Sequence, residues 1–439
     1  MISALLFTLL LLGSGTVFYL SIKKIRRNIL LGKDISISDN KSERLKTMLK
    51  VAFGQSKMVA RPVAGIMHFF IYAAFIITQI ELLEIIIDGV SNGHRRLWHL
   101  IDGTFLAGLY TFTINLIEVL SVLAFVATIT FLSRRNIIRL ARFQMPELKG
   151  WPSKDANIIL LMEIILIVCI MTMNGADLVL QSKGEAHPTA QFIISSQLSG
   201  FFSGFDIPTL FVLERIGWWG HILGIFGFLV YLPHSKHLHI LLAFPNTYYS
   251  NLKAKGEFTT LDSVTDVVAP NFDPSYQPKT DPNNPVRFGV KDVQDLSWKN
   301  LLDAYTCTEC GRCTSACPQN ATGKKLSPRK IMMDTRDRLV EVGKNIDANN
   351  GKFVDDGKSL LGDYISSEEI WACNTCNACV QECPVNINPL EIIVEMRRYL
   401  VMEQSQSPAE LNNMFTNIEN NGAPWQFSPA DRANWVNEN

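Results

Sequence analysis

The sequence predicts an all-α membrane protein, in which a bundle of five transmembrane helices precedes a smaller α-helical domain. Two observations support this prediction. Apolar runs long enough to cross a bilayer crowd residues 2–244, whereas residues 245–439 hold most of the Asn, Asp and Pro and eight of the nine cysteines. The 439 residues carry no net charge, so the composition does not indicate a nucleic-acid partner.

Five apolar stretches predict the transmembrane helices. They lie near residues 2–20, 62–88, 104–132, 155–180 and 210–244, and roughly 20 helical residues suffice to cross a hydrocarbon core of about 30 Å. The first stretch has no basic residue before its apolar run and no small-residue cleavage site, so we interpret it as a retained helix rather than a signal peptide. The transmembrane domain is therefore predicted to comprise residues 1–244.

Basic residues predict the orientation of this domain. The connections over 21–61 and 133–154 are rich in Lys and Arg, whereas the two opposite connections contain only Arg95, Arg96, Lys183 and Arg215. Lys and Arg near the ends of spans are retained on the cytoplasmic side. We therefore expect the N-terminus outside a bacterial inner membrane and the cysteine-rich part in the cytoplasm.

The eight clustered cysteines form two copies of one motif. Residues 307–318 read CTECGRCTSACP and residues 373–384 read CNTCNACVQECP. In a reducing compartment, this spacing indicates metal sites rather than disulfides, and it is typical of [4Fe-4S] proteins in which the fourth cysteine of each motif binds the other cluster. The predicted ligands are Cys307, Cys310, Cys313 and Cys383 for one cluster, and Cys373, Cys376, Cys379 and Cys317 for the other. Structural zinc is the alternative, although zinc sites usually consist of two close cysteine pairs.

The chain around the motifs predicts a helical ferredoxin domain. The segment SPRKIMMDTRDRLVEVG lies between the motifs, and NPLEIIVEMRRYLVMEQ follows the second motif. Both have apolar residues at helical spacing and a proline near the start, where a helix tolerates one. We expect a linker over 245–300, an α-helical dicluster ferredoxin domain over 301–402 and a polar tail over 403–439.

Three histidines in the apolar stretches are candidate haem ligands, because an ionisable side chain in a membrane span is costly. His68 and His239 both lie near the cytoplasmic ends of predicted spans, so they would bind one b-type haem from its two sides. His221 precedes His239 by 18 residues, about 27 Å along a helix, and would lie in the outer leaflet. A second haem there would need an unusual ligand such as His99 or Met173. The alternative for each histidine is a neutral ring hydrogen-bonded inside the bundle.

Other polar residues leave two interpretations open. Five carboxylates lie in predicted spans: Glu81, Glu84, Glu118, Glu163 and Asp177. They would be either paired or protonated packing residues, or groups that pass protons to and from a quinone. The loop over 181–209 would line a quinone pocket or lie at the membrane interface, and His234 and His237 are expected near the lipid headgroups.

These residues resemble a known family. The segment WWGHILGIFGFLVYLPHSKHLHI, with His221 and His239, is similar to the last helix of the gamma subunit of respiratory nitrate reductase, a five-helix dihaem cytochrome b. The segment GQSKMVARPVAGIMHFF, with His68, and the cysteine motifs resemble the membrane-bound, heterodisulfide reductase-like iron-sulfur oxidoreductases, including the type that links electron-transfer flavoprotein to menaquinone. The resemblance reaches about residue 400 and implies a five-helix haem b bundle followed by the dicluster domain.

Two departures from the family pattern concern the second haem and the partners. The nitrate reductase subunit has a second histidine on its second helix, where this sequence has Thr78; the resemblance therefore implies one haem b and leaves a second open. Larger family members continue into domains with a Cys-Cys-Gly element, which this sequence lacks, so we expect that element on a separate iron-sulfur subunit. Trp425, Phe427 and Trp435 in the polar tail suit docking of a partner; a disordered tail is the alternative.

Together these features predict a membrane-anchored electron-transfer subunit of a quinone-linked oxidoreductase. Electrons from electron-transfer flavoprotein would reach the two clusters through the Cys-Cys-Gly subunit and then pass through haem b to menaquinone. All eight motif thiolates would be ligands, so a catalytic flavin or substrate site is expected on a partner. The alternatives are a quinol-oxidising subunit that feeds a heterodisulfide or sulfur-compound reductase, and a membrane redox sensor.

Overall fold

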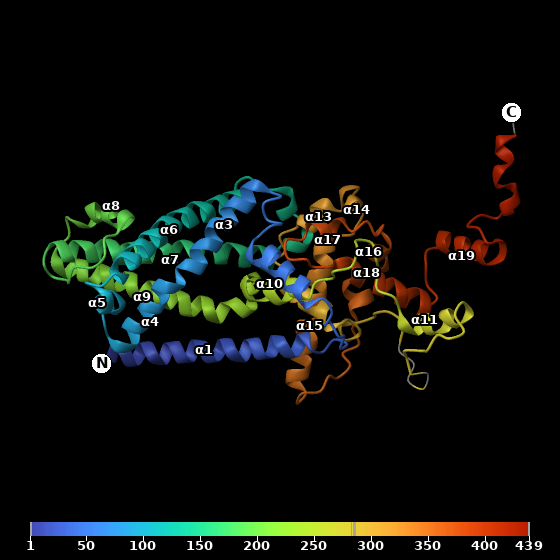
Figure 1. The fold of residues 1–439 in the computed structure, drawn as a ribbon, viewed down its shortest axis with the longest axis horizontal. Coiled ribbons are helices and arrows are strands. Elements are labelled where there is room, and N and C mark those ends of the chain that lie inside the picture. The colour runs from blue at the N-terminus through green and yellow to red at the C-terminus, as the bar shows by residue number, and fades with distance from the viewer. Residues whose placement is uncertain (1, 282, 284–286, 438–439) are drawn as a thin grey trace.

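The computed structural model describes residues 2–281, 283 and 287–437. A bundle of long helices forms one end of an elongated molecule, and a domain of shorter helices forms the other (Figure 1). Five helical segments are long and apolar enough to cross a membrane: Ile2–Ile29, Pro62–Ser91, Leu106–Asn136, Trp151–Ser182 and Ile207–His234. Within the described residues there are two isolated bridges and no β-strand, so the predicted all-α fold is confirmed.

The packing of the bundle is typical of helices in lipid. In α1 (Ile2–Ile29), Leu5, Leu9 and Leu12 point outward and are exposed in the protein alone. In the interior, α7 (Trp151–Ser182) and α9 (Ile207–Tyr231) approach closely at Gly217, where a Cβ atom would lie 2.7 Å from the Cys169 carbonyl oxygen. Small residues allow such close contacts between transmembrane helices, which lack a hydrophobic driving force in lipid.

The first helix is longer than the predicted 2–20, because it continues beyond the membrane run to Ile29. Its basic last turn binds the second domain: Arg27 pairs with Asp347, and the Asn28 side-chain amide donates a hydrogen bond to the Tyr305 hydroxyl at 2.9 Å. Helical residues after an apolar run need not lie in lipid if another domain satisfies their polar groups, and here they join the two parts of the protein.

The second span consists of α3 (Pro62–Ile77) and α4 (Gln79–Ser91), which meet at Thr78. The third span is α6 (Leu106–Asn136). The short helices α5 (Arg96–Ile101) and α8 (Ile193–Phe202) lie at the end of the bundle opposite the second domain (Figure 1).

The fifth helix is shorter than the predicted span over 210–244. It ends at Tyr231, and two 3-10 turns, Leu232–His234 and Lys236–Leu238, precede a separate helix, α10 (His239–Tyr248). Pro233 explains the interruption, because its ring has no N–H and clashes with the carbonyl of the preceding turn. His221 and His239 therefore do not lie on one continuous helix, and the distance of about 27 Å expected from 18 helical residues does not apply.

The second domain packs directly on the bundle. Its principal helices are α12 (Trp298–Thr306), α13 (Arg312–Ala316), α15 (Pro328–Ala348), α17 (Ala378–Glu382) and α18 (Pro389–Arg398). A single buried core joins Ile25 and Leu232 of the bundle to Leu301, Ile331 and Ile392 of this domain. The domain is therefore attached to the bundle by an apolar interface as well as by the chain.

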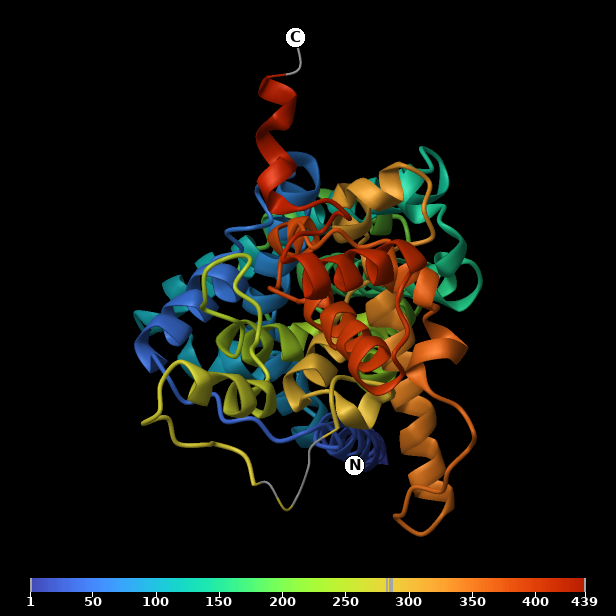
Figure 2. The ribbon, with the colours of Figure 1, turned by 90° about the vertical axis from the view of Figure 1, so that its right-hand side faces the viewer.

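The predicted linker and tail contain more structure than expected. Between α10 and α12 the chain forms α11 (Asp262–Val268), and α12 begins at Trp298 because Ser297 and Asn300 form a capping box. In the tail, α19 (Ala409–Asn421) ends at Gly422, and a 3-10 helix over Pro429–Val436 follows. Figure 2 shows this last segment projecting away from the rest of the molecule.

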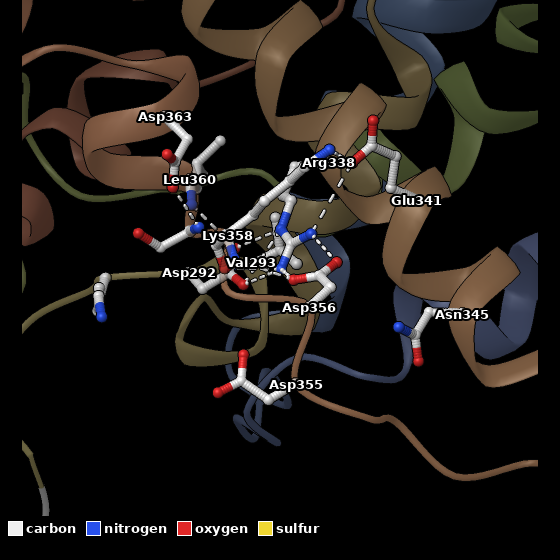
Figure 3. A network of polar contacts seen from close by, with 12 residues as sticks. Asp292, Val293, Arg338, Glu341, Asn345, Asp355, Asp356, Lys358, Leu360 and Asp363 are labelled. Atoms are coloured by element: carbon white, nitrogen blue, oxygen red, sulfur yellow. Dashed lines mark hydrogen bonds and ion pairs between the residues drawn. The ribbon is translucent and has the colours of Figure 1, made fainter. Parts of the chain in front are cut away.

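A buried arginine joins the segments that surround α15 (Figure 3). The Arg338 side chain is fully buried and donates hydrogen bonds to Asp292 at 2.8 Å, to Asp356 at 2.6 Å and to the Lys358 carbonyl at 2.9 Å. Asp292 in turn accepts the Leu360 N–H at 3.0 Å. One guanidinium therefore connects the start of the domain, α15 and the loop before the second cysteine motif.

We expect Arg338→Met to destabilise this domain by about 3 kcal/mol, since removing one partner of a buried ion pair leaves uncompensated buried charge. The measurement is the urea concentration at which the metal-loaded protein loses the near-ultraviolet and visible absorbance of its clusters. Lys358→Met is the matched control: it keeps the carbonyl contact and removes only an exposed ion pair to Glu341 at 3.4 Å, so its effect should be below about 0.5 kcal/mol. Equal shifts for both variants would contradict the role of Arg338.

Candidate iron-sulfur and haem sites

The two cysteine motifs adopt the same local backbone. Left-handed residues lie between their cysteines at matching positions, Glu309 (φ 56°) and Gly311 (φ 71°) in the first motif and Thr375 (φ 54°) and Asn377 (φ 60°) in the second. Glycine and asparagine adopt this conformation at low cost. The short helices α13 and α17 follow at once, so each motif curls around a small space instead of extending.

Two cavities lie between the motifs, and cysteines of both motifs line each of them. The first cavity is lined by Cys307, Cys310, Cys313 and Cys383, together with Cys379, which lines both cavities. The second cavity is lined by Cys317, Cys373, Cys376 and Cys379. The fourth cysteine of each motif therefore stands at the cavity of the other motif. Among the described residues, no three His, Cys, Asp or Glu side chains converge closely enough to hold a single metal ion.

Backbone N–H groups donate to two of the motif sulfurs, and burial raises the pKa of several motif thiols. Thr375 N–H points at the Cys373 sulfur at 3.4 Å, and Ile387 N–H points at the Cys383 sulfur at 3.3 Å. Burial raises the pKa of Cys307 and Cys379 to about 12 and that of Cys383 to about 11. Without a metal these thiols would hold their protons at neutral pH; a bound metal displaces them.

The first cavity faces the bundle, and the second faces solvent. The loop before α3 covers the first cavity: Lys57 Nζ donates to the Cys383 carbonyl at 3.2 Å, and Arg61 pairs with Glu382 at 3.1 Å. At the second cavity Cys376 is exposed. The two thiol sets thus stand at different distances from the membrane end of the molecule.

Glu309 connects the first cysteine motif to the 3-10 turn that follows the fifth long helix. Its carboxylate pairs with Lys236 at 2.7 Å and with Arg336 at 2.8 Å. Burial raises the pKa of Glu309, but these two cations lower it more, so its pKa lies below the ordinary value. The Lys236 carbonyl is 2.9 Å from His239 Nδ1. A short polar chain therefore joins the first cavity to a predicted haem ligand.

The structure brings His68 and His239 together. Their ring centroids are 6.4 Å apart, with an angle of 46° between the rings. His68 Nδ1 is buried and has no hydrogen-bond partner, whereas His239 Nδ1 is held by the Lys236 carbonyl. His237 lies between Phe228 and His239, at centroid distances of 5.1 and 5.9 Å. The sequence predicts His237 at the headgroups; the 3-10 turn over Lys236–Leu238 places it beside His239 instead, which helical spacing could not have indicated, because residues two apart on a helix do not face each other.

Among the described residues, no other histidine ring lies against His221. His221 Nδ1 is 2.9 Å from the Leu166 carbonyl on the facing helix. Met173, one of the partners considered for a second haem, packs in an apolar cluster with Trp218 and Ile222. His99, the other, lies on α5 with its ring centroid 5.9 Å from that of His187.

A buried polar cluster at the far end of the bundle was not anticipated as a unit. Arg95 is only 4% exposed and pairs with Glu81 at 3.5 Å and Glu84 at 3.3 Å. The Tyr110 hydroxyl donates to Glu84 at 2.6 Å. Near this cluster, Asp177 contacts His94 at 3.2 Å.

Two further carboxylates lie elsewhere in the bundle. Glu118 accepts the Ile194 N–H of α8 at 2.8 Å, and Glu163 accepts a hydrogen bond from the Thr128 hydroxyl at 3.1 Å. Each in-span carboxylate therefore has a polar partner.

Residues 306–387 match the 4Fe-4S dicluster domain family. The chain contains a 4Fe-4S dicluster domain. All eight motif cysteines, which line the two cavities, lie within the matched residues. The predicted iron-sulfur domain is confirmed at this level.

Curated relatives extend the comparison to the whole chain. The chain is 28% identical to the probable iron-sulfur-binding oxidoreductase FadF of Bacillus subtilis and 28% identical to the EtfAB:quinone oxidoreductase of Syntrophomonas wolfei, over 99% of its own length in each case. It spans 61% and 59% of those two proteins. Over 34% of its length it is 32% identical to a probable membrane-anchored ferredoxin of Chromohalobacter salexigens, of which the match covers 24%. Subunits of heterodisulfide reductases match shorter segments, and no solved structure gives a significant match.

These relatives confirm the predicted resemblance to membrane-bound iron-sulfur oxidoreductases. The chain is a homologue of proteins named as oxidoreductases, and the dicluster domain and apolar helices agree with that relationship.

Proposed function

We propose that this chain is the membrane-anchored electron-transfer part of a quinone-linked oxidoreductase. The observation that carries the proposal is the placement of one four-thiol cavity against the bundle, close to His68 and His239, and of another at the surface. When bound, two [4Fe-4S] clusters and a haem b would supply one-electron transfer between a soluble donor and a quinone. The fold would supply the distances between these groups and the charges around them.

The thiol sets fit cubane clusters. Four thiols around a cavity suit a cluster with four iron corners, whereas zinc would draw four thiols to one point. We therefore assign Cys307, Cys310, Cys313 and Cys383 to one [4Fe-4S] cluster and Cys373, Cys376, Cys379 and Cys317 to the other. The N–H groups of Thr375 and Ile387 would donate to bound thiolates, which stabilises their negative charge.

His68 and His239 fit axial ligands of one haem b. Two imidazoles that bind one metal through Nε2 have centroids about 6 Å apart, because metal–imidazole bonds are about 2 Å long; the rings here lie 6.4 Å apart. The Lys236 carbonyl accepts the Nδ1 proton of His239, which leaves Nε2 free to bind, the usual arrangement for a metal-binding histidine. His221 has the same arrangement with Leu166, and we propose it as a ligand of a second haem only if a partner supplies the other side.

We further propose the natural setting of the chain. The bundle would cross a bacterial cytoplasmic membrane with the N-terminus outside and the dicluster domain in the cytoplasm, as the basic connections indicate. The donor would be an electron-transfer flavoprotein that acts through a Cys-Cys-Gly iron-sulfur component, and the acceptor would be menaquinone. The similarity to the EtfAB:quinone oxidoreductase of Syntrophomonas wolfei supports the flavoprotein and quinone parts of this proposal.

A second candidate is electron flow in the opposite direction. Matches to heterodisulfide reductase subunits from methanogens favour a quinol-oxidising role that feeds a disulfide reductase. The same residues would hold the same cofactors, so the relative potentials of the sites distinguish the two directions.

The test is anaerobic purification from membranes, followed by iron, sulfide and haem analysis and by reduction with dithionite. We expect about eight iron atoms per chain in clusters, a b-type haem spectrum, and reoxidation of both by a soluble menaquinone analogue. Zinc in place of iron would contradict the cluster assignment. A protein with clusters that the quinone analogue leaves reduced would contradict the proposed acceptor.

A further inference from the structure

The charges around the two thiol-lined cavities are unequal. Three cations at the first cavity have no carboxylate partner among the described residues: Lys57, Arg142 and Arg312. Arg312 lies in the cavity wall and donates only to the Lys57 and Met58 carbonyls, at 3.0 and 3.4 Å. The Nε atom of Arg142 is buried and has no hydrogen-bond partner.

Most other cations near the first cavity are paired with carboxylates, and Arg135, which forms no ion pair within the described residues, lies near Glu309. Arg61 pairs with Glu382 at 3.1 Å and Arg329 pairs with Glu147 at 2.8 Å. Lys236 and Arg336 share Glu309 and have further carboxylates in Asp155 and Asp337. The unpaired positive charge beside the cysteines of this cavity therefore comes from Lys57, Arg142 and Arg312.

The second cavity has a neutral wall. Besides its four thiols, it is lined by Leu326, Pro328, Asn374, Asn377, Leu390 and Ile393. One cation without a carboxylate partner in the described structure lies nearby: Arg397 donates to the Ile370 carbonyl at 2.7 Å and also contacts the Cys373 carbonyl.

The groups that shift the pKa of these cations also differ between the first and the second cavity. Burial lowers the pKa of Arg142 and Arg312, and a thiolate at Cys310, such as a bound metal would produce, raises the pKa of both. Burial likewise lowers the pKa of Lys57, against the Cys383 thiol. For Arg397 the opposing group is Cys373. Three unpaired cations thus face thiols of the first set, and one faces a thiol of the second set.

We propose that Lys57, Arg142 and Arg312 give the cluster of the first cavity the higher reduction potential, so that electrons enter at the exposed second cavity and move toward the membrane. This inference rests on the proposed function. Reduction adds one negative charge to a cluster already made anionic by four thiolates, and fixed cations nearby stabilise that added charge. Unpaired buried guanidinium groups are costly in themselves, and an anionic cluster supplies the missing counter-charge.

Burial of the first cavity acts in the opposite direction, because a low-dielectric surrounding disfavours the more highly charged reduced form. Arg312 is buried, and Lys57 and Arg142 are half-buried, so water screens each of them less than it would screen a fully solvated charge. We expect the excess of two unpaired cations to decide the order. In each transfer one electron leaves the cluster of the second cavity, which is oxidised, and reduces the cluster of the first; a reduced flavoprotein replaces the electron and a quinone removes it.

The test is a potentiometric titration of the metal-loaded protein, followed by electron paramagnetic resonance. We expect two cluster signals with separate midpoint potentials. Cys310 lines only the first cavity and Cys376 only the second, so Cys310→Ser and Cys376→Ser assign each signal to its cavity. The signal altered by Cys310→Ser should be the one with the higher potential.

Variants that each remove one positive charge then test whether the unpaired cations cause the difference in reduction potential. Arg142→Gln and Lys57→Gln should each lower the higher potential and leave the lower one in place, while the matched control Arg397→Gln should lower only the lower potential. Two independent variants at the first cavity keep the test decisive if one of them does not assemble. Equal potentials, a reversed order, or charge variants that shift neither signal or both signals alike would overturn the inference. Loss of both signals in the unaltered protein would instead overturn the proposed function.

Discussion

Cys317→Ala will remove the cluster of the second cavity and leave the cluster of the first. Cys317 belongs to the first motif in sequence, but the structure places it in the second cavity with Cys373, Cys376 and Cys379. Three remaining thiolates do not hold a complete cubane firmly, whereas the first set keeps all four of its thiols. We expect the iron content to fall by about half, measured as iron and acid-labile sulfide per chain.

The comparison that makes this result specific uses two further variants. The electron paramagnetic resonance spectrum of Cys317→Ala should match that of Cys376→Ala, which removes a thiol of the same cavity. It should differ from the spectrum of Cys310→Ala. If each motif instead bound its own cluster with four consecutive cysteines, Cys317→Ala would resemble Cys310→Ala, and the interleaved assignment would be abandoned.

His239→Ala will eliminate nearly all bound haem b and leave the iron-sulfur clusters in place. The imidazole of His239 is the one held by the Lys236 carbonyl and facing His68 at 6.4 Å between centroids, and loss of an axial ligand removes a direct bond to iron. The cluster thiols belong to a different part of the fold, so their content should not change. A pyridine haemochrome assay and iron analysis on the same sample measure both quantities.

Neighbouring histidines provide the controls for this variant. His234 is exposed, and His234→Ala should retain haem. His237 lies 5.9 Å from His239 between ring centroids, so it is the competing ligand. Haem lost from His237→Ala and kept by His239→Ala would show that His237 is the ligand opposite His68.

These two experiments also test whether the helical bundle and the dicluster domain hold their cofactors independently of each other. Cluster loss without haem loss, and the reverse, are expected if the bundle and the dicluster domain each form their own sites. The shared core that includes Ile25 and Ile331 makes some mutual stabilisation inevitable, which is why both contents are measured in every variant.

Several features of the protein were predictable because they depend on residues close together in the chain. Twenty or so apolar residues in a row can satisfy their backbone only as a helix in lipid, so the helical bundle follows from composition alone. The repeated C-x2-C-x2-C-x3-C-P spacing likewise predicts a dicluster domain, and residues 306–387 match that family. Helix ends were less predictable: Pro233 ends the fifth helix early, while the first helix extends to Ile29 because the second domain binds its polar last turn.

What the sequence by itself determined is the chemistry of the chain: apolar spans, eight thiols at cluster spacing and histidines within reach of the membrane. What only the tertiary structure decided is which of these groups meet. Lys57, Arg142 and Arg312 come from three distant segments, and their approach to one cavity depends on how the domain packs on the bundle. The Arg95 cluster has the same origin, since Glu81 and Glu84 approach Arg95 from α4 and Asn174 approaches it from α7. Long-range packing brings such charges together, and no local periodicity encodes it.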